Sequence, residues 1–275
     1  MEQQSHKPSG VEIWRRYDAI ERRLSTPLTN RMLELGNLSP GMKVLDIATG
    51  RGEPAIPAAK AIVPDGFVLG LDIDRSILEL ARERADREEI KNLELGVSNF
   101  ETLDGISEHH FEVALARWGL MYFQNPVRAL QIVRRALVSG GLLVAAVWTD
   151  PENATFFQLP RAAFAKFAAV PAIDHNQPGT FYYTDLTRLT RDLKSADFAV
   201  LHNETMTVEV MEVSSDDELI AWGRSFGMWD ALNGMSAAEQ SGWEQELVQL
   251  AEPYRTSKGT IRISGRTLIV VAEAN

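Results

Sequence analysis

The 275-residue chain contains no cysteine. A chain without thiols forms no disulfide bridge, offers no thiolate nucleophile and builds no cysteine-based metal site. No other constellation of histidine, aspartate and glutamate stands out at metal-ligand spacing, so we expect no bound metal. Any catalytic or binding site must therefore be built from other side chains.

Long apolar runs and basic blocks are also missing. No uninterrupted apolar run approaches the roughly 18 residues that span a bilayer. The first ten residues are polar and lack the apolar core of a signal peptide, so we expect a soluble, cytoplasmic protein. Lys and Arg number 28 against 38 Asp and Glu, a net charge of −10. This acidic balance argues against a nucleic-acid partner, because binding to phosphates relies on clustered basic residues. The most charged stretch, residues 82–89, mixes both signs and predicts a solvated helix face.

The most informative segment present is KVLDIATGRGEPAIP, residues 43–57. Its apolar start is typical of a buried parallel strand, and Gly50 and Gly52 allow a sharp turn and a close approach to a ligand. Asp46 lies inside this strand, where a buried charge is costly unless something binds it. The segment predicts a nucleotide-type cofactor at the carboxyl end of a first strand.

Short apolar runs alternate with amphipathic stretches over the first half of the chain. This alternation predicts a doubly wound α/β fold with a mostly parallel sheet. Strands are expected at 44–48, 67–72, 93–97, 111–116 and 142–148, and helices at 54–62, 75–89 and 126–137. An N-terminal helical segment, residues 11–36, is expected to break at Pro27.

After Trp148 the alternation stops. Helical segments are expected at 153–169, 184–196, 216–232 and 237–252, a loop at 171–179 and a strand at 199–210. The last residues carry two β-type runs around Ser264-Gly265, which predict an antiparallel C-terminal hairpin. We expect one domain, residues 1–275: a helical cover at 11–36, a cofactor-binding core at 37–150, lid insertions at about 151–197 and 211–257, and terminal strands at 258–275.

Asp72 ends the second expected strand, 20 residues after Gly52. A carboxylate at this point can accept hydrogen bonds from the ribose hydroxyls of an adenosine. The nearby Asp74 is assigned to capping the next helix. After the third strand, the Asn99 amide can read an adenine amino group and Phe100 can cover the ring, although Asn is also an ordinary turn residue there.

Glycine spacing alone leaves dinucleotide and adenosyl cofactors open, because Gly50-x-Gly52-x-x-Ala55 also fits the weak dinucleotide fingerprint. Two features favour an adenosyl cofactor. Asp46 could receive the ammonium of an amino-acid moiety, and the chain ends in a β pattern where a dinucleotide fold would have a second mononucleotide-binding half. A P-loop is excluded, because no Gly-Lys-Ser/Thr follows the turn.

At the level of whole motifs, LDIATGRGEPA resembles motif I of class I S-adenosylmethionine-dependent methyltransferases. GLDIDRSILELARERA, SNFETL and FEVALARWGLMYFQNPVRALQIVRRALVSGGLLVAAVW are similar to the segments that follow it in that family. The resemblance is strongest to the ubiquinone/menaquinone-biosynthesis branch and its small-molecule relatives. It implies a Rossmann-like, seven-stranded methyltransferase fold and S-adenosyl-L-methionine as cofactor, with S-adenosyl-L-homocysteine as product.

The resemblance also assigns roles to individual residues. It places Asp46, Ala48, Gly50 and Gly52 around the methionine part, and Asp72 at the ribose. The remaining cofactor roles fall to Ile73 packing on adenine, Asn99 and Phe100 at the ring, the Arg117 backbone carbonyl beside the methionine moiety, and Tyr17 closing over the carboxylate.

Methyl transfer from a sulfonium needs mainly in-line positioning, with a base only where the acceptor is protonated. The base candidates in the expected lid and near the fifth strand are His175, Asp150 and Tyr122. A flat apolar acceptor pocket is predicted from aromatic and Met side chains, each of which could equally be a core residue. The pocket candidates are Trp14, Trp118, Met121 and Trp148.

We therefore expect methyl transfer to the O, N or C atom of a small, aromatic, quinone or polyketide-like molecule. The alternatives are an adenosylmethionine-binding protein that catalyses another reaction such as cyclisation, a non-catalytic protein on this scaffold, and an NAD-dependent oxidoreductase. The expected partner is the small-molecule acceptor, and a homodimer stays open.

Overall fold

The structure is a computed structural model that describes residues 7–103, 106–170 and 172–275. The polar start at 1–6 and the first residue of the expected loop, 171, lie outside the described residues. The chain divides into two compact units. The first unit comprises Met1–Ser25, Pro151–Ile173 and Thr207–Gly265, and the second comprises Thr26–Asp150, Asp174–Met206 and Arg266–Asn275. The segment expected as a lid at 151–197 is divided between the two units.

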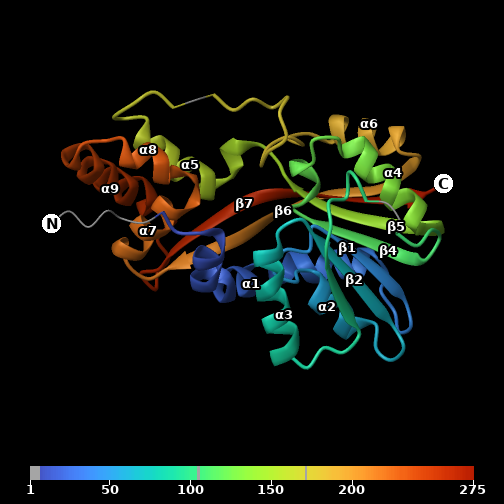
Figure 1. The fold of residues 1–275 in the computed structure, drawn as a ribbon. Coiled ribbons are helices and arrows are strands. Elements are labelled where there is room, and N and C mark those ends of the chain that lie inside the picture. The colour runs from blue at the N-terminus through green and yellow to red at the C-terminus, as the bar shows by residue number, and fades with distance from the viewer. Residues whose placement is uncertain (1–6, 104–105, 171) are drawn as a thin grey trace. The chain divides into compact units, whose positions relative to one another are not determined.

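The fold is built on one seven-stranded sheet with the order β3-β2-β1-β4-β5-β7-β6 (Figure 1). Strands β1 to β5 pair in parallel, and β7 pairs antiparallel to β5. The strands are β1 Lys43–Ile47, β2 Phe67–Asp72, β3 Leu93–Val97, β4 Phe111–Arg117, β5 Leu137–Trp148, β6 Phe198–Val213 and β7 Ile261–Ala274. The order reverses at β1, where β2 lies on one side and β4 on the other. The predicted doubly wound sheet with antiparallel C-terminal strands is confirmed.

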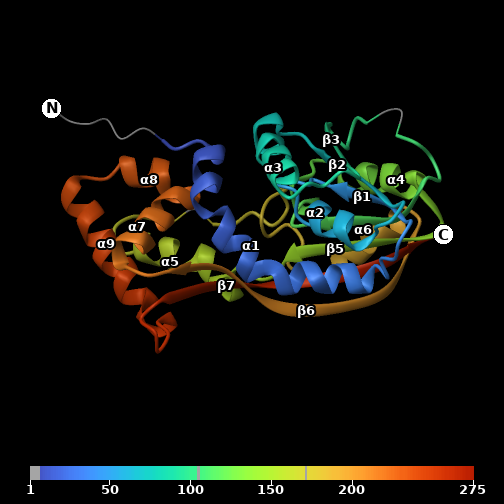
Figure 2. The same cartoon turned by 90° about the horizontal axis from the view of Figure 1, so that it is seen from below.

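Helices cover both faces of this sheet in the second unit (Figures 1 and 2). Helices α2 and α3 lie on one face, and α4 and α6 on the other. Their bounds are α2 Ala55–Ala61, α3 Arg75–Arg87, α4 Pro126–Ala136 and α6 Leu186–Ser195. The 3-10 helix η1, Leu120–Tyr122, follows β4. This layering buries both faces of the parallel strands, which explains their nearly continuous apolar sequences.

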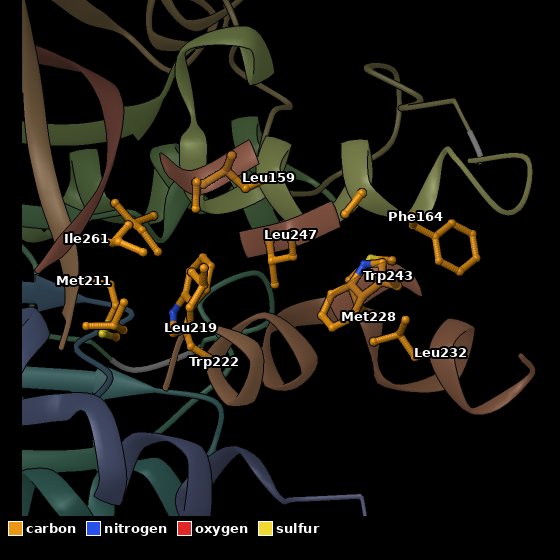
Figure 3. Packing of buried hydrophobic residues seen from close by; sticks show 14 of the residues in the cluster. Leu159, Phe164, Met211, Leu219, Trp222, Met228, Leu232, Trp243, Leu247 and Ile261 are labelled. Carbon is orange, nitrogen blue, oxygen red and sulfur yellow. The ribbon is translucent and has the colours of Figure 1, made fainter. Parts of the chain in front are cut away.

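The first unit has its own hydrophobic cluster (Figure 3). Trp243 and Trp222 are almost fully buried in it, and the Trp243 Nε1–H donates to the Pro160 carbonyl over 3.0 Å. Burial of such large rings is a main source of stability in a unit of this size. Its elements are the start of α1 Gly10–Leu35, η2 Pro151–Asn153, α5 Thr155–Phe164, α7 Asp216–Gly223, the π-helix η3 Arg224–Met228, α8 Trp229–Asn233, α9 Ala237–Ala251 and η4 Glu252–Tyr254.

Three local expectations were wrong. The predicted break at Pro27 does not occur, because α1 continues through Pro27 to Leu35. The fully buried Leu28 and Met32 offset the hydrogen bond that proline removes. The two C-terminal runs form one strand, β7, with no turn at Ser264-Gly265. The single helical stretch expected at 216–232 is divided by the π-helix.

Within the described ranges, no helix combines the length and apolarity that crossing a membrane requires.

Candidate active site

Asp46 is fully buried at the end of β1, on the reversal point of the sheet. Its Oδ2 accepts hydrogen bonds from the Thr49 hydroxyl at 2.6 Å and from the Ala55 N–H at 3.0 Å. Its Oδ1 is buried and accepts no hydrogen bond from a described residue. Burial raises the pKa of Asp46 from its ordinary value of 3.8 to about 7, although the Thr49, Ala55 and Arg117 interactions pull the pKa down. This carboxylate lacks one donor, which a bound ammonium group could supply.

The raised pKa predicts a pH dependence of stability that Asp46→Asn removes. Between about pH 4 and about pH 7 the folded chain holds a proton that the unfolded chain releases. The free energy of unfolding therefore falls as pH rises through this window, by up to about 1.4 kcal/mol per pH unit for one proton. Urea unfolding of the wild type and of Asp46→Asn across this window should give a difference in the free energy of unfolding that changes steadily with pH. Parallel profiles would contradict the assignment.

The turn after β1 contains three residues in the left-handed backbone region. They are Ala48 with φ +54°, Gly50 with φ +54° and Gly52 with φ +84°. This conformation suits glycine but strains alanine by about 1 kcal/mol. The Ala48 side chain meets Gly119 beyond the end of β4, where an added Cβ would lie 2.6 Å from the Ala48 Cβ. The turns after β1 and β4 are therefore in close contact.

This contact predicts a compensating pair of substitutions. Gly119→Ala should lower the free energy of unfolding by about 1–3 kcal/mol, because the new methyl group overlaps the Ala48 Cβ. Adding Ala48→Gly removes the overlapping methyl group and leaves the Ile47 carbonyl as the next neighbour at 3.4 Å. Urea unfolding of both single variants and the double variant should show most of the loss recovered. If the effects of the two substitutions on the free energy of unfolding were simply additive in the double variant, the contact would be contradicted.

Asp72 ends β2, and its carboxylate accepts hydrogen bonds from the backbone of two neighbouring segments. The Gly50 N–H donates to its Oδ2 at 2.8 Å, and the Asp74 N–H donates to its Oδ1 at 2.9 Å. Each carboxylate oxygen keeps a second lone pair for a ligand hydroxyl. The predicted helix cap at Asp74 is confirmed, because its Oδ1 accepts from the Ser76 and Ile77 N–H groups. Ile73 is 68% exposed, an apolar surface available for a ring next to Asp72.

Asn99 and Phe100 follow β3 at the same edge of the sheet. The Asn99 Oδ1 accepts from the Glu101 N–H at 2.9 Å, which is the local turn that Asn favours. The Phe100 ring is almost fully buried and lies 6.4 Å from the Phe123 ring, centre to centre. The ring is therefore part of the core, while the adenine role of this segment stays a prediction.

At the end of β4 the Trp118 N–H donates to the Ala146 carbonyl of β5. The carbonyl and N–H of a trans peptide point in opposite directions. The Arg117 carbonyl therefore faces β1, on the other side of β4, and the glycine turn that follows β1. The Trp118 ring stacks on Trp148 with centroids 4.2 Å apart, and Met121 is fully buried.

The three base candidates lie in the second unit. Asp150 is exposed just after β5. The Tyr122 hydroxyl is 3.1 Å from the Thr180 hydroxyl, and the Gly179 N–H donates to the Met121 carbonyl. These contacts hold the loop that carries His175 against η1. His175 Nδ1 lies 3.1 Å from the Phe181 carbonyl, so Nδ1 is the protonated nitrogen and Nε2 the acceptor in the neutral ring.

Trp14 and Tyr17 belong to the first unit, where both rings pack on Phe226 at centroid distances of 5.4 and 5.9 Å. Tyr17 is 4% exposed there. Their roles toward cofactor and acceptor stay predictions.

A buried ion pair lies behind the glycine turn and was not predicted from the sequence. Glu53 directly follows Gly52, and its Oε1 lies 2.8 Å from the Arg84 Nη1 of α3, with both side chains under a tenth exposed. The Thr29 hydroxyl donates to Glu53 Oε2 at 3.0 Å. The prediction of a solvated helix face at 82–89 was therefore wrong for Arg84. The sequence feature that indicates the burial of Arg84 is its helical spacing from the buried Leu78 and Ala81.

These residues fit an S-adenosylmethionine-type ligand better than a metal. The edge of the sheet offers a carboxylate lacking a donor, a turn of small residues and an acidic strand end, all of which suit an amino-acid nucleoside. Among the described residues, no three His, Asp or Glu gather at metal-binding distance.

Comparison with known proteins places the chain in a family. Residues 38–183, more than half of the chain, match the family model described as a methyltransferase domain, and the chain belongs to this family. The predicted resemblance to S-adenosylmethionine-dependent methyltransferases is confirmed.

Two curated relatives are similar over about half of the chain. Aklanonic acid methyltransferase DauC of Streptomyces sp. (strain C5) is 30% identical over 52% of this chain and 64% of its own length. The ubiquinone/menaquinone biosynthesis C-methyltransferase UbiE of Pseudomonas fluorescens (strain SBW25) is 32% identical over 44% of this chain and 48% of its own. The chain thus spans less than two thirds of the length of either relative.

Solved structures show the same fold at low identity. A SAM-dependent methyltransferase from Aquifex aeolicus has a TM-score of 0.53 at 18% identity, covering 72% of this chain and 92% of its own. The 4+2 cyclase SpnF has a TM-score of 0.54 at 17% identity, covering 97% of both chains.

Proposed function

We propose that the chain transfers the methyl group of S-adenosylmethionine to an O, N or C atom of a small, flat, aromatic, quinone or polyketide-like molecule. The observation that carries the proposal is the buried Asp46 Oδ1 beside a glycine turn, an oxygen to which none of the described residues donates a hydrogen bond. Family membership and the names of the similar DauC and UbiE support the reaction class.

In this proposal Asp46 receives the ammonium of the cofactor, and Ala48, Gly50 and Gly52 form the turn around its methionine part. The second lone pairs of the Asp72 oxygens accept from the ribose hydroxyls. Ile73 packs on the adenine, with Asn99 and Phe100 at the ring edge. Tyr17 is assigned to the cofactor carboxylate.

When bound, the cofactor supplies a methyl group on a sulfonium whose positive charge disappears on transfer. The chain then needs to align the acceptor and exclude water. Trp14, Trp118, Met121 and Trp148 are assigned to the acceptor. For a protonated acceptor, His175 Nε2 is the preferred base, because its Nδ1 already has a partner and its loop is held against Tyr122. Asp150 and the Tyr122 hydroxyl are the other candidates.

Calorimetry with S-adenosylmethionine, S-adenosylhomocysteine and NAD tests the cofactor, and a panel of aromatic, quinone and polyketide acceptors with labelled cofactor tests the reaction by mass. We expect adenosyl ligands to bind, NAD to fail, and methyl incorporation with at least one acceptor. Adenosyl binding with a changed acceptor but no added methyl group would favour cyclisation or another reaction. Binding of NAD alone would overturn the proposal.

A further inference from the structure

Trp118 stands out in the fold because a bulky side chain occupies the left-handed backbone region, with φ +58°. Such a conformation is strained and persists only where surrounding contacts impose it. Trp118 directly follows the Arg117 carbonyl that faces β1 and the glycine turn. Its backbone conformation therefore helps to set the direction of the peptide beside the proposed methionine site.

The contacts that impose this conformation come from β5 and β7. Thr267 of β7 is fully buried and is the register partner of Trp148. The Trp118 Nε1–H donates to the Thr267 hydroxyl at 3.1 Å, and this hydroxyl donates to the Val147 carbonyl at 2.8 Å. Because the Thr267 hydroxyl hydrogen points at the Val147 carbonyl, a lone pair of the hydroxyl oxygen is directed at the indole N–H.

The Trp118 indole also makes two contacts through its ring. Trp148 stacks at 4.2 Å with an interplanar angle of 18°, and the Arg117 guanidinium lies over the ring 4.7 Å from its centre. Both contacts are attractive, but neither has the directionality of a hydrogen bond. The hydrogen bond to Thr267 adds a contact of defined direction at the indole N–H.

We propose that Thr267 is a positioning residue, which fixes the Trp118 indole and thereby holds the peptide between residues 117 and 118 toward the glycine turn. This inference rests on the proposed function, because the peptide matters through cofactor binding. Thr267 accepts from Trp118 and donates to the β5 backbone, and it lies at the far end of a row of strands, β1-β4-β5-β7, from Asp46.

The test compares Thr267→Val, which keeps the shape and loses the hydroxyl, with Thr267→Ser, which keeps the hydroxyl. We expect the Val variant to bind S-adenosylhomocysteine about tenfold more weakly, as its strained backbone relaxes, and the Ser variant to bind as the wild type does. Near-ultraviolet circular dichroism of the stacked indoles should change in the Val variant only. Trp118→Phe breaks the same hydrogen bond from the other side and should weaken binding as much, which covers a Val variant that does not fold.

A double-mutant cycle with Trp118→Gly tests whether Thr267 acts through Trp118, because glycine has no indole to hold and adopts a positive φ without strain. In that background Thr267→Val should leave the affinity unchanged. An equal loss in both backgrounds, or a Val variant with wild-type affinity and dichroism, would overturn the inference. Failure of the wild type to bind the ligand would instead overturn the proposed function, and the dichroism would still report whether Thr267 holds the indole.

Discussion

Arg84→Met should lower the free energy of unfolding by about 3–5 kcal/mol. The substitution keeps a long apolar side chain but leaves the Glu53 carboxylate buried, at 8% side-chain exposure, without its cation. A single unpaired buried charge costs far more than the pair itself contributes, because the desolvation of the remaining ion is no longer offset. Glu53 directly follows Gly52, so the same variant should also bind the cofactor more weakly.

Urea unfolding monitored by tryptophan fluorescence measures the change in the free energy of unfolding caused by Arg84→Met. Arg84 also pairs with Glu88 at 2.8 Å, so the control must lie outside this network. Lys166→Met is the matched control, because Lys166 pairs with Glu246 at the surface, where its own side chain is 62% exposed and the pair contributes about 0–1 kcal/mol. Adding Glu53→Gln to Arg84→Met removes the unpaired charge and should recover part of the loss. A cost below about 1 kcal/mol for Arg84→Met would contradict the role of this buried pair.

Arg84 also marks the limit of sequence reasoning for this chain. Its neighbours Arg82 and Asp86 carry charges of opposite sign. This local pattern alone favours a solvent-exposed helix face. Burial of Arg84 depends on Glu53, which lies 31 positions earlier and reaches α3 only through the folded turn. Pairs with such separation are set by tertiary packing, which no local period encodes.

Features set by local chemistry were predicted well. β2 and β3 have the expected bounds, and Asp74 caps α3 as expected from its place before the helix. The glycine turn and Asp72 meet through the Gly50 N–H, as the carboxyl ends of neighbouring parallel strands require. The continuous strand β7 could not be foreseen, because long-range contacts override the turn tendency of Ser264-Gly265. The strand pairs with β5 from Leu142↔Glu273 to Trp148↔Thr267, and the Thr155 hydroxyl bonds both the N–H and the carbonyl of Ser264. The role of Thr267 became visible only through this register.

Asp72→Ala should weaken binding of S-adenosylhomocysteine by about 100-fold or more. Two hydrogen bonds from ribose hydroxyls to a carboxylate account for about 3 kcal/mol or more, since charge-assisted bonds contribute about 1.5–3 kcal/mol each. The variant also frees the Gly50 N–H, which now donates to Asp72 Oδ2, and so loosens the turn around the methionine part.

The ribose and turn contributions of Asp72 can be separated by calorimetry on two further variants. Asp72→Asn keeps one oxygen acceptor, so it should lose less affinity than Asp72→Ala, while Asp86→Ala, an exposed carboxylate on α3, should bind as the wild type does. A ligand without ribose hydroxyls, 2′,3′-dideoxy-S-adenosylhomocysteine, completes the design. Its affinity for the wild type should be low, and Asp72→Ala should reduce it only by the smaller amount that the loosened turn accounts for. If Asp72→Ala weakened both ligands equally, the carboxylate would act on the turn alone and the ribose assignment would be wrong.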